Sequence, residues 1–201
     1  MRNYWLYASI FTVLLLLALF EPSSSEYLMF DRQLINSGEI WRLFSAHFVH
    51  LSNTHMLGNL LAVALVGYIA GASLNNLTGV LLLLWCTLVV GLGLYFFADH
   101  LYRYVGLSGV LHGLLVVAPF VSPFYSRRIA LCFLLVIVLK VIWEQSGFYD
   151  DMALVNTIGG RVETLAHLFG LLAGLIYLST WLLRQKLLRK KRLKKKEASP
   201  V

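Results

Sequence analysis

The sequence predicts an all-α, polytopic membrane protein in which six transmembrane helices form one bundle. Hydrophobic residues make up 59% of the 201 residues and charged residues only 13%. A soluble domain carries about 25% charged residues because its surface faces water. The apolar residues fall in long unbroken runs, without the alternation of barrel strands, so no β structure is expected. One membrane domain is predicted at residues 1–183, followed by a basic tail at residues 184–201.

The six apolar runs are Tyr4–Phe20, Met56–Ala72, Leu77–Phe97, Leu107–Val121, Ile129–Trp143 and Thr164–Leu183. A spanning helix needs about 20 residues, so the fourth and fifth runs are short. The first run could instead be a secretory signal, with Arg2 as its basic end and Pro22-Ser-Ser-Ser25 after it. Its apolar core is longer than that of most signals, which favours an uncleaved helix. Cleavage would leave the orientation of the other runs unchanged.

Basic residues predict the orientation. Nine of the seventeen Lys and Arg residues lie between Arg184 and Lys196. Such a cluster after an apolar run is typical of a cytoplasmic anchor on anionic lipids, and nucleic acid is not the expected partner. With the N-terminus inside, twelve basic residues lie inside and four outside, and nine of the ten acidic residues lie outside. Both termini are therefore predicted to be cytoplasmic, with the loop from Glu21 to about Asn53 outside.

A serine between glycines begins the fourth run, in the string Gly106-Leu-Ser-Gly-Val-Leu-His-Gly113. From Ser108 to Pro123 a helix rises about 22 Å, whereas the hydrocarbon core is about 30 Å thick. If Pro123 marks the inner boundary, Ser108 lies about 8 Å below the outer one. The hydroxyl is thus predicted to be submerged in the membrane.

Two ridges of small residues predict the partner of this serine. The ridges are Gly109 and Gly113 in the fourth run and Ala166, Gly170 and Gly174 in the sixth. Small residues at this spacing let two helices approach closely, which would bring Ser108 within hydrogen-bond reach of His167. A serine nucleophile needs a base, and neutral imidazole suits that role. His112, four residues after Ser108, is a competing base. No acid is evident near His167, so a dyad is expected.

The oxyanion of such a reaction must meet hydrogen-bond donors. The candidates are the backbone N–H of Ser108 and the side chains of His55 and Asn59, which share one helix face. The outer loop adds His47, His50 and Asn53, which could supply water to the same cavity or serve as hydrogen-bond links between helices.

These motifs resemble those of the rhomboid intramembrane serine proteases. Gly106-Leu-Ser-Gly109 resembles the family's G-x-S-G motif with its nucleophile, and Ala166-His-Leu-Phe-Gly170 resembles A-H-x-x-G with its base. His55-Met-Leu-Gly-Asn59 resembles the H-x-x-x-N oxyanion motif, and Trp41-Arg42 the W-R pair of the first outer loop. His112 departs from the pattern, since family members often carry an aromatic residue packed on the catalytic histidine there.

The resemblance implies a cavity open to the outside, a substrate that enters sideways from the membrane, and no metal or cofactor. The expected partners are a membrane-anchored protein substrate and the lipid bilayer, which the resemblance implies is a bacterial inner membrane. The short chain and the Gly106–Gly113 string are most similar to the rhombosortase branch, which is associated with trimming surface proteins that end in a Gly-Gly motif, an apolar helix and a basic tail.

Two other functions compete with a protease. A catalytically silent rhomboid-like protein would bind membrane clients, but its usual mark is the loss of the serine or the histidine, and both are present. Histidines within the membrane also occur in transporters, although the sequence shows no inverted repeat or pair of broken helices.

Overall fold

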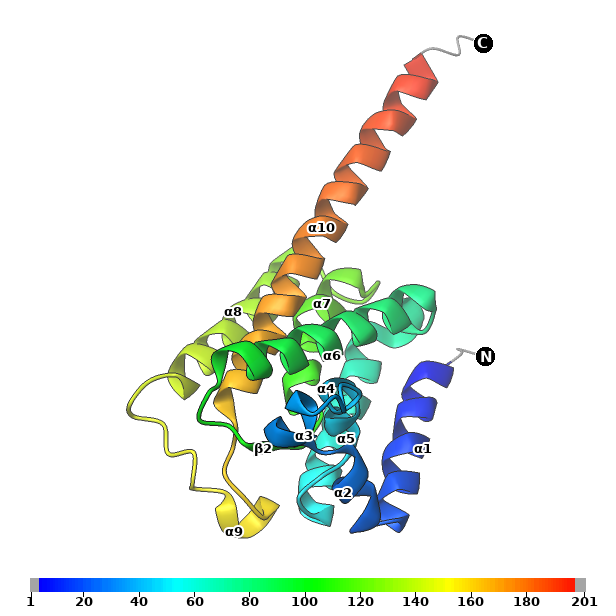
Figure 1. Ribbon diagram of the computed structural model, residues 1–201. Helices are drawn as coiled ribbons and strands as arrows, with labels where there is room; N and C mark the ends of the chain where they lie inside the picture. Colours follow the sequence, from blue (N-terminus) through cyan, green and yellow to red (C-terminus); the bar gives the residue numbers. More distant parts are fainter. Residues whose placement is uncertain (1–3, 198–201) are drawn as a thin grey trace.

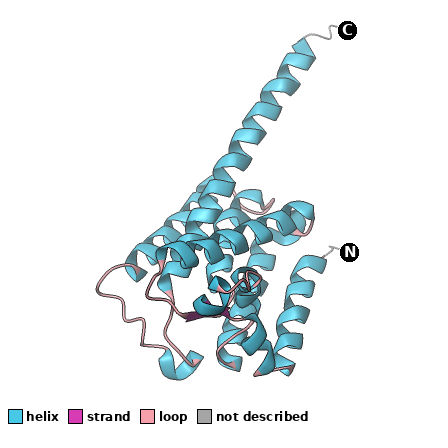
Figure 2. Cartoon of the chain, in the orientation of Figure 1, coloured by secondary structure: helices cyan, strands magenta, loops and turns pink. Residues whose placement is uncertain are grey.

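Helices account for most of residues 4–197, the part of the chain that the computed structural model describes (Figures 1 and 2). In chain order, with η marking 3₁₀ turns, they are α1 (Trp5–Leu19), α2 (Ser23–Leu28), α3 (Arg32–Asn36), α4 (Arg42–Ser45), η1 (Ala46–Phe48), α5 (Asn53–Ala70), η2 (Gly71–Leu74), α6 (Leu77–Phe97), α7 (Ser108–Val121), α8 (Arg127–Glu144), α9 (Val155–Ile158) and α10 (Thr164–Glu197). Arg2, part of the predicted inner charge, lies outside the described residues, as do residues 198–201 of the tail.

The six predicted apolar runs correspond to α1, α5, α6, α7, α8 and α10. Two helices, α5 and α8, begin earlier than the predicted runs because a serine caps the start of each. The side chain of Ser52 accepts from a backbone N–H of the first turn of α5, and Ser126 does the same for α8. Each cap satisfies a donor that would otherwise have no partner at the helix start. At the other end, α10 continues past Leu183 to Glu197, so the predicted tail begins as part of the same helix.

Within residues 4–197, three helical stretches are long and apolar enough to cross a membrane: Asn53–Leu74, Leu77–Phe97 and Thr164–Arg192. Two shorter apolar helices, α1 and α7, accompany them. Large apolar side chains such as Leu61, Leu81 and Leu135 are exposed on the outside of the bundle. Exposed apolar surface on this scale is expected where lipid covers a protein. The fold is that of an integral membrane protein built as a helical bundle.

Helix α7 lies at the centre of the bundle. It packs against α5, α6, α8 and α10, and every residue from Gly109 to Pro119 except Leu115 is buried. A helix that is apolar on all sides is expected in such a position. The first residue of α7, Ser108, is therefore held by four neighbouring helices.

The expectation of no β structure is wrong at one place. Strand β1 (Phe30–Asp31) pairs antiparallel with β2 (Arg103–Tyr104). Arg32 follows β1, and its guanidinium donates to the Leu101 carbonyl at 2.8 Å and to three carbonyls at the end of α6: Leu94 at 2.9 Å, Tyr95 at 2.7 Å and Ala98 at 2.8 Å. The last carbonyls of a helix lack intrahelical partners, so this arginine caps α6. The ribbon and the cap fasten the first loop to the segment that leads into α7.

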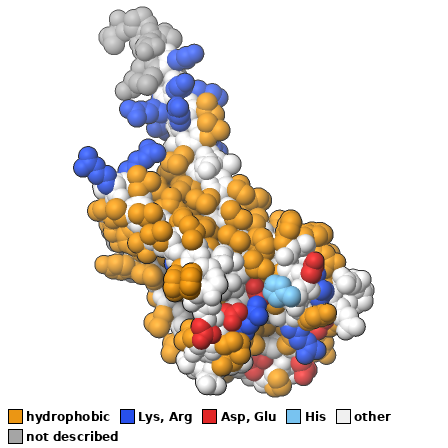
Figure 3. Space-filling model, turned by 90° about the vertical axis from the view of Figure 1, so that its left-hand side faces the viewer, with side chains coloured by type: hydrophobic (Ala, Val, Ile, Leu, Met, Phe, Trp, Pro, Cys, Tyr) orange, Lys and Arg blue, Asp and Glu red, His pale blue; other side chains and the backbone are white. Residues whose placement is uncertain are grey.

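Charged side chains gather at the two ends of the molecule, with a band of hydrophobic side chains between them (Figure 3). Lys and Arg side chains crowd the projecting end of α10, and acidic side chains lie at the opposite end. The short helix α9 also lies at that opposite end (Figure 1).

Candidate active site

The predicted contact between the two small-residue ridges is present. A Cβ atom added to Gly109 would lie 2.6 Å from the carbonyl oxygen of Ala166, and one added to Gly174 would lie 2.7 Å from that of Gly113. Real Cβ atoms essentially never come closer than 3.0 Å to such an atom. Helices α7 and α10 therefore approach more closely than side chains would permit.

This approach brings Ser108 and His167 together. The Oγ atom of Ser108 lies 2.9 Å from Nε2 of His167. Ser108 precedes Gly109 and His167 follows Ala166, so one of these close backbone contacts lies directly beside the pair. His167 is buried, with 6% of its surface exposed. The hydroxyl and the imidazole are in the geometry required of a nucleophile and its base.

The expectation that no acid lies near His167 is wrong. Both carboxylate oxygens of Glu144, the last residue of α8, lie at 2.9 and 3.0 Å from Nδ1 of His167. A carboxylate only accepts, so Nδ1 carries the proton and Nε2 is free to accept from Ser108. Glu144 was counted among the acids of the outer loops, but its side chain turns into the bundle and is buried. Three residues therefore form one hydrogen-bonded chain.

His112, the competing base, faces other partners. Its Nδ1 atom donates to the backbone carbonyl of Ser108 at 2.8 Å, and its Nε2 atom lies 3.0 Å from Nζ of Lys140. A carbonyl and an ammonium at the two nitrogens fix the tautomer, with the proton on Nδ1. The His112 ring stacks on that of His167, with centroids 4.1 Å apart and an angle of 22° between the planes. This geometry favours His167 as the base, and His112 packs against it as a stacked ring.

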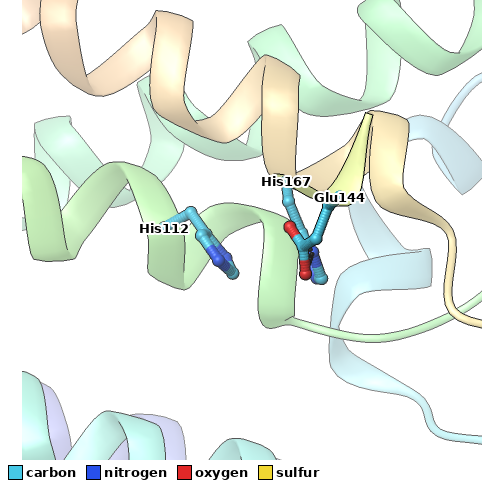
Figure 4. Close-up of side chains that lie close together, drawn as sticks. All are labelled: His112, Glu144 and His167. Carbon is cyan, nitrogen blue, oxygen red and sulfur yellow. Dashed lines mark hydrogen bonds and ion pairs between the residues drawn. The ribbon is translucent and has the colours of Figure 1, made fainter. Parts of the chain in front are cut away.

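His112, Glu144 and His167 project from three different helices into the same space (Figure 4). Their nitrogen and oxygen atoms lie within 4.8 Å of one another, a spacing that a metal ion could use. The Lys140 ammonium already contacts Glu144 and His112, however, and His167 lies between Glu144 and Ser108. A metal would have to displace the lysine and break the Ser108 contact. The donor set fits an ammonium better than a metal ion.

The two predicted oxyanion residues lie across the cavity from this chain. His55 and Asn59, both on α5, line the same cavity as Ser108 and His167. Gly106, with φ of +119°, makes room for the histidine: a Cβ there would lie 2.7 Å from the His55 ring. The Asn59 amide nitrogen donates to the His55 carbonyl at 3.1 Å. The backbone N–H of Ser108, in the first turn of α7, lacks an intrahelical acceptor.

The cavity in front of Ser108 has a volume of about 870 Å³. Apolar side chains such as Leu111, Leu115 and Ile158 form much of its wall. Polar side chains of its wall have partners: Arg161 pairs with Asp151 at 2.8 Å, and Nε2 of His100 lies 3.7 Å from a carboxylate oxygen of Glu163. A cavity of this size and character suits a mainly apolar peptide segment.

The first-loop residues of the W-R pair lie away from the cavity. Arg42 is buried, and its guanidinium contacts Glu39 at 2.7 Å and the carbonyls of Glu26 and Met29 at 3.0 and 2.9 Å. The Trp41 indole donates to the carbonyl of Tyr27 at 3.3 Å. Both side chains therefore stabilise the conformation of the first loop.

Of the two alternatives for His47, His50 and Asn53, a supply of water to the cavity of Ser108 is not supported, because none of the three lines that cavity. His47 is almost fully buried beside Tyr104, and burial lowers its pKa to about 4, so the ring is neutral. His50 and Asn53 line a second cavity, beside Pro22 and the end of α1. Burial, together with the nearby His55, lowers the pKa of His50 to about 3, and its ring packs edge-on against His55 at 5.0 Å. His50 thus helps to fix the orientation of the His55 ring by packing against it.

Sequence reasoning missed Lys140 and Glu144. Both are ionisable and lie four residues apart at the end of an otherwise apolar run. An ionisable residue inside a membrane segment is costly and marks a functional site by default, and a spacing of four places two side chains on one face. That signal could have found the pair.

The fold and this site define a class of protein: a membrane-embedded helical bundle with a serine, a histidine and a carboxylate at the centre. The family model described as "Rhomboid domain" matches residues 37–185. The chain also resembles the Bacillus subtilis (strain 168) protein described as "Putative rhomboid protease YdcA", with 27% identity over 142 residues, 71% of this chain and 67% of the relative. The chain belongs to the rhomboid family, and this membership indicates intramembrane protease activity.

Proposed function

We propose that the protein is an intramembrane serine endopeptidase with Ser108 as nucleophile and His167 as base. The observation that carries the proposal is the hydrogen-bonded chain from Ser108 Oγ through His167 to Glu144, with contacts of 2.9 Å on both sides of the imidazole. This chain faces a cavity large enough for a peptide segment. Glu144 extends the expected dyad, because it holds the proton on Nδ1 and leaves Nε2 free to act.

In the first half of the reaction, Ser108 Oγ attacks the scissile carbonyl carbon and its proton passes to Nε2 of His167. The new oxyanion is met by the Ser108 N–H and by donors from His55 and Asn59. When the intermediate collapses, the carbon–nitrogen bond breaks and Nε2 returns its proton to the leaving amine. Glu144 stabilises the imidazolium that exists between these two steps.

In the second half, a water gives a proton to Nε2 and its oxygen attacks the acyl carbon. When this intermediate collapses, the bond from carbon to Ser108 Oγ breaks, Nε2 returns the proton to Oγ, and the product leaves with a new carboxyl group. The cavity confines the acyl-enzyme among mainly apolar side chains. Apart from Lys140 and Glu144 beside His167, its charged lining residues are Arg103, Arg161 and Glu163, on the side of the loops that precede α7 and α10. Water is therefore expected to arrive from that side.

We infer a membrane topology of six spanning helices, with both termini in the cytoplasm and the cavity open to the periplasm. The crowding of Lys and Arg at the projecting end of α10, and of acids at the other end, supports this orientation under the positive-inside rule (Figure 3). Cysteines introduced at Ser25 and at Gln185, with Cys132 replaced, test it in intact cells. An impermeant maleimide should react at Ser25→Cys only.

We propose membrane-anchored proteins with a Gly-Gly motif before an apolar helix and a basic tail as the substrate class. The support is the similarity of the Gly106–Gly113 string to the rhombosortase branch. A reporter that carries such a tail should be cut by the purified protein and spared when its glycines are replaced by valine. Mass spectrometry of the new C-terminus distinguishes a free carboxylate, the product of hydrolysis, from transfer to an amine.

Labelling with a fluorophosphonate tests the nucleophile directly. The wild-type protein should be labelled and Ser108→Ala should not, while Ser25→Ala, at a half-buried serine in α2, serves as the matched control. Loss of labelling in His167→Ala, with labelling retained in His112→Ala, assigns the base. Persistent labelling of Ser108→Ala would refute the proposal. A folded wild-type protein that never reacts would favour the client-binding alternative.

A further inference from the structure

Lys140 closes a ring of hydrogen bonds around the proposed catalytic residues. Its ammonium contacts a carboxylate oxygen of Glu144 and lies 3.0 Å from Nε2 of His112. His112 in turn donates to the Ser108 carbonyl, and Glu144 binds His167, which contacts Ser108 Oγ. These five residues come from α7, α8 and α10, and we refer to them as the five-residue ring.

Lys140 is the one member of the ring that neither reacts nor touches a reacting residue, so its role must be exerted through its neighbours. Glu144 is buried, and an uncompensated charge in such a place is costly. With the ammonium present, the charges of the carboxylate and the ammonium cancel. Without it, the least costly response is for Glu144 or His167 to bind a proton. A proton on Glu144 or on His167 would weaken His167 as a base, because its Nε2 atom must accept the proton of the Ser108 hydroxyl.

We propose that Lys140 is a positioning residue whose ammonium keeps Glu144 ionised and prevents the Glu144–His167 pair from holding an additional proton. This inference rests on the proposed function, since it concerns the base of the same site. His112 anchors the lysine: its Nε2 accepts from the ammonium, and its Nδ1 ties that contact to the first turn of α7. The Lys140 ammonium is thus held by two groups, the Glu144 carboxylate and the stacked ring of His112.

Other titratable groups face the Glu144–His167 pair and are part of the same balance. Lys140 lies on α8 and His112 on α7, while His55 on α5 interacts electrostatically with His167. Tyr149, in the loop after α8, interacts with Glu144; burial and then this carboxylate raise the pKa of Tyr149, so its hydroxyl is neutral at physiological pH. His55 and His112 are neutral when they act as a hydrogen-bond donor and acceptor here. Lys140 thus supplies the positive charge that offsets Glu144.

The test is the rate of fluorophosphonate labelling as a function of pH. In Lys140→Met, which keeps the apolar stem and loses the charge, the rise in labelling with pH should move up by about one pH unit or more. Lys186→Met, in the basic stretch of α10, is the matched control and should follow the wild-type curve. Lys140→Gln, which is neutral but can still donate, should shift like Lys140→Met and replaces it if the methionine variant does not fold.

The double variant Lys140→Met/Glu144→Gln separates this role from a merely structural one. If Lys140 acts through the charge of Glu144, the lysine substitution should not move the pH curve in the Glu144→Gln background. A lysine that only stabilises the fold would lower labelling equally in both backgrounds and leave the pH curve in place.

The two failures are distinguishable. An unlabelled wild-type protein, or a labelled Ser108→Ala, would remove the proposed function and this inference with it. A labelled wild type and an unlabelled Ser108→Ala, combined with an unshifted pH curve in Lys140→Met and Lys140→Gln, would overturn the role of Lys140 alone.

Discussion

Replacement of Gly109 by alanine should separate the serine from its base. The added Cβ would meet the carbonyl oxygen of Ala166 at 2.6 Å, whereas ordinary contacts lie at 3.4 Å or more and 3.0 Å is the lower limit. Relief of the overlap therefore requires a movement of 0.4 to 0.8 Å between α7 and α10. The same movement would lengthen the 2.9 Å contact between Ser108 and His167 to between 3.3 and 3.7 Å. Hydrogen bonds weaken strongly over that range.

The expected result is a fall of about 10²-fold in labelling rate, the lower end of what loss of a general base costs. Overpacking should also destabilise the fold by about 1–3 kcal/mol, partly offset by about 1 kcal/mol because alanine favours helix more than glycine. Labelling kinetics and thermal unfolding in detergent measure the two effects separately.

Gly147→Ala is the control, because a Cβ there meets nothing within 4 Å. If Gly109→Ala remained folded and was labelled at the wild-type rate, the close approach of α7 and α10 would not be what places the base. The argument from the small-residue ridges would then be refuted.

Three further predictions concern the wall of the cavity and the first loop. His55→Ala and Asn59→Ala should each lower turnover by about 10²-fold, because each removes a proposed oxyanion donor; unchanged turnover in both would leave them structural. Arg42→Met should lower the unfolding temperature without changing the labelling rate of the folded protein, because it leaves Glu39 and two carbonyls without their donor; a normal unfolding temperature would contradict this. Burial raises the pKa of Asp31, but hydrogen bonds from the Leu34 N–H and from Arg103 outweigh it, and the net pKa is lowered. A lowered folded-state pKa stabilises the fold above about pH 4 and loses this effect as pH falls further, so the gap in unfolding temperature between wild type and Asp31→Asn should shrink below that pH; a constant gap would argue against an ionic role.

The apolar runs were sufficient to predict the main helices, because a long apolar segment in a bilayer must satisfy its own backbone hydrogen bonds and therefore forms a helix. The meeting of Ser108 and His167 could also be predicted, since glycine ridges on parallel helices leave few ways to pack. Glu144 could not be placed from the charge pattern. It was assigned to the outer loop, but it ends α8, and side chains on a helix lean towards its N-terminus, which here is towards the interior.

Lys140 was missed for a related reason. The count of twelve inner and four outer basic residues omits it, because it belongs to neither surface. The cap that Arg32 places on α6 was beyond prediction, since its carbonyl partners lie more than sixty residues away along the chain. The β1–β2 ribbon is equally hard to foresee, because two-residue strands carry no periodicity.

Helix α10 carries His167 near one end and the basic residues from Arg184 onwards near the other, without interruption. Its rise from His167 to Arg184 is about 26 Å. In the proposed topology, the basic end of α10 lies at the inner headgroups, so the length of this helix sets the depth of the proposed base, His167, below that surface. In a substrate whose own basic tail lies at that surface, the depth of the scissile bond is set from the same surface. The peptide bond presented to Ser108 should then stay the same in thin and thick bilayers.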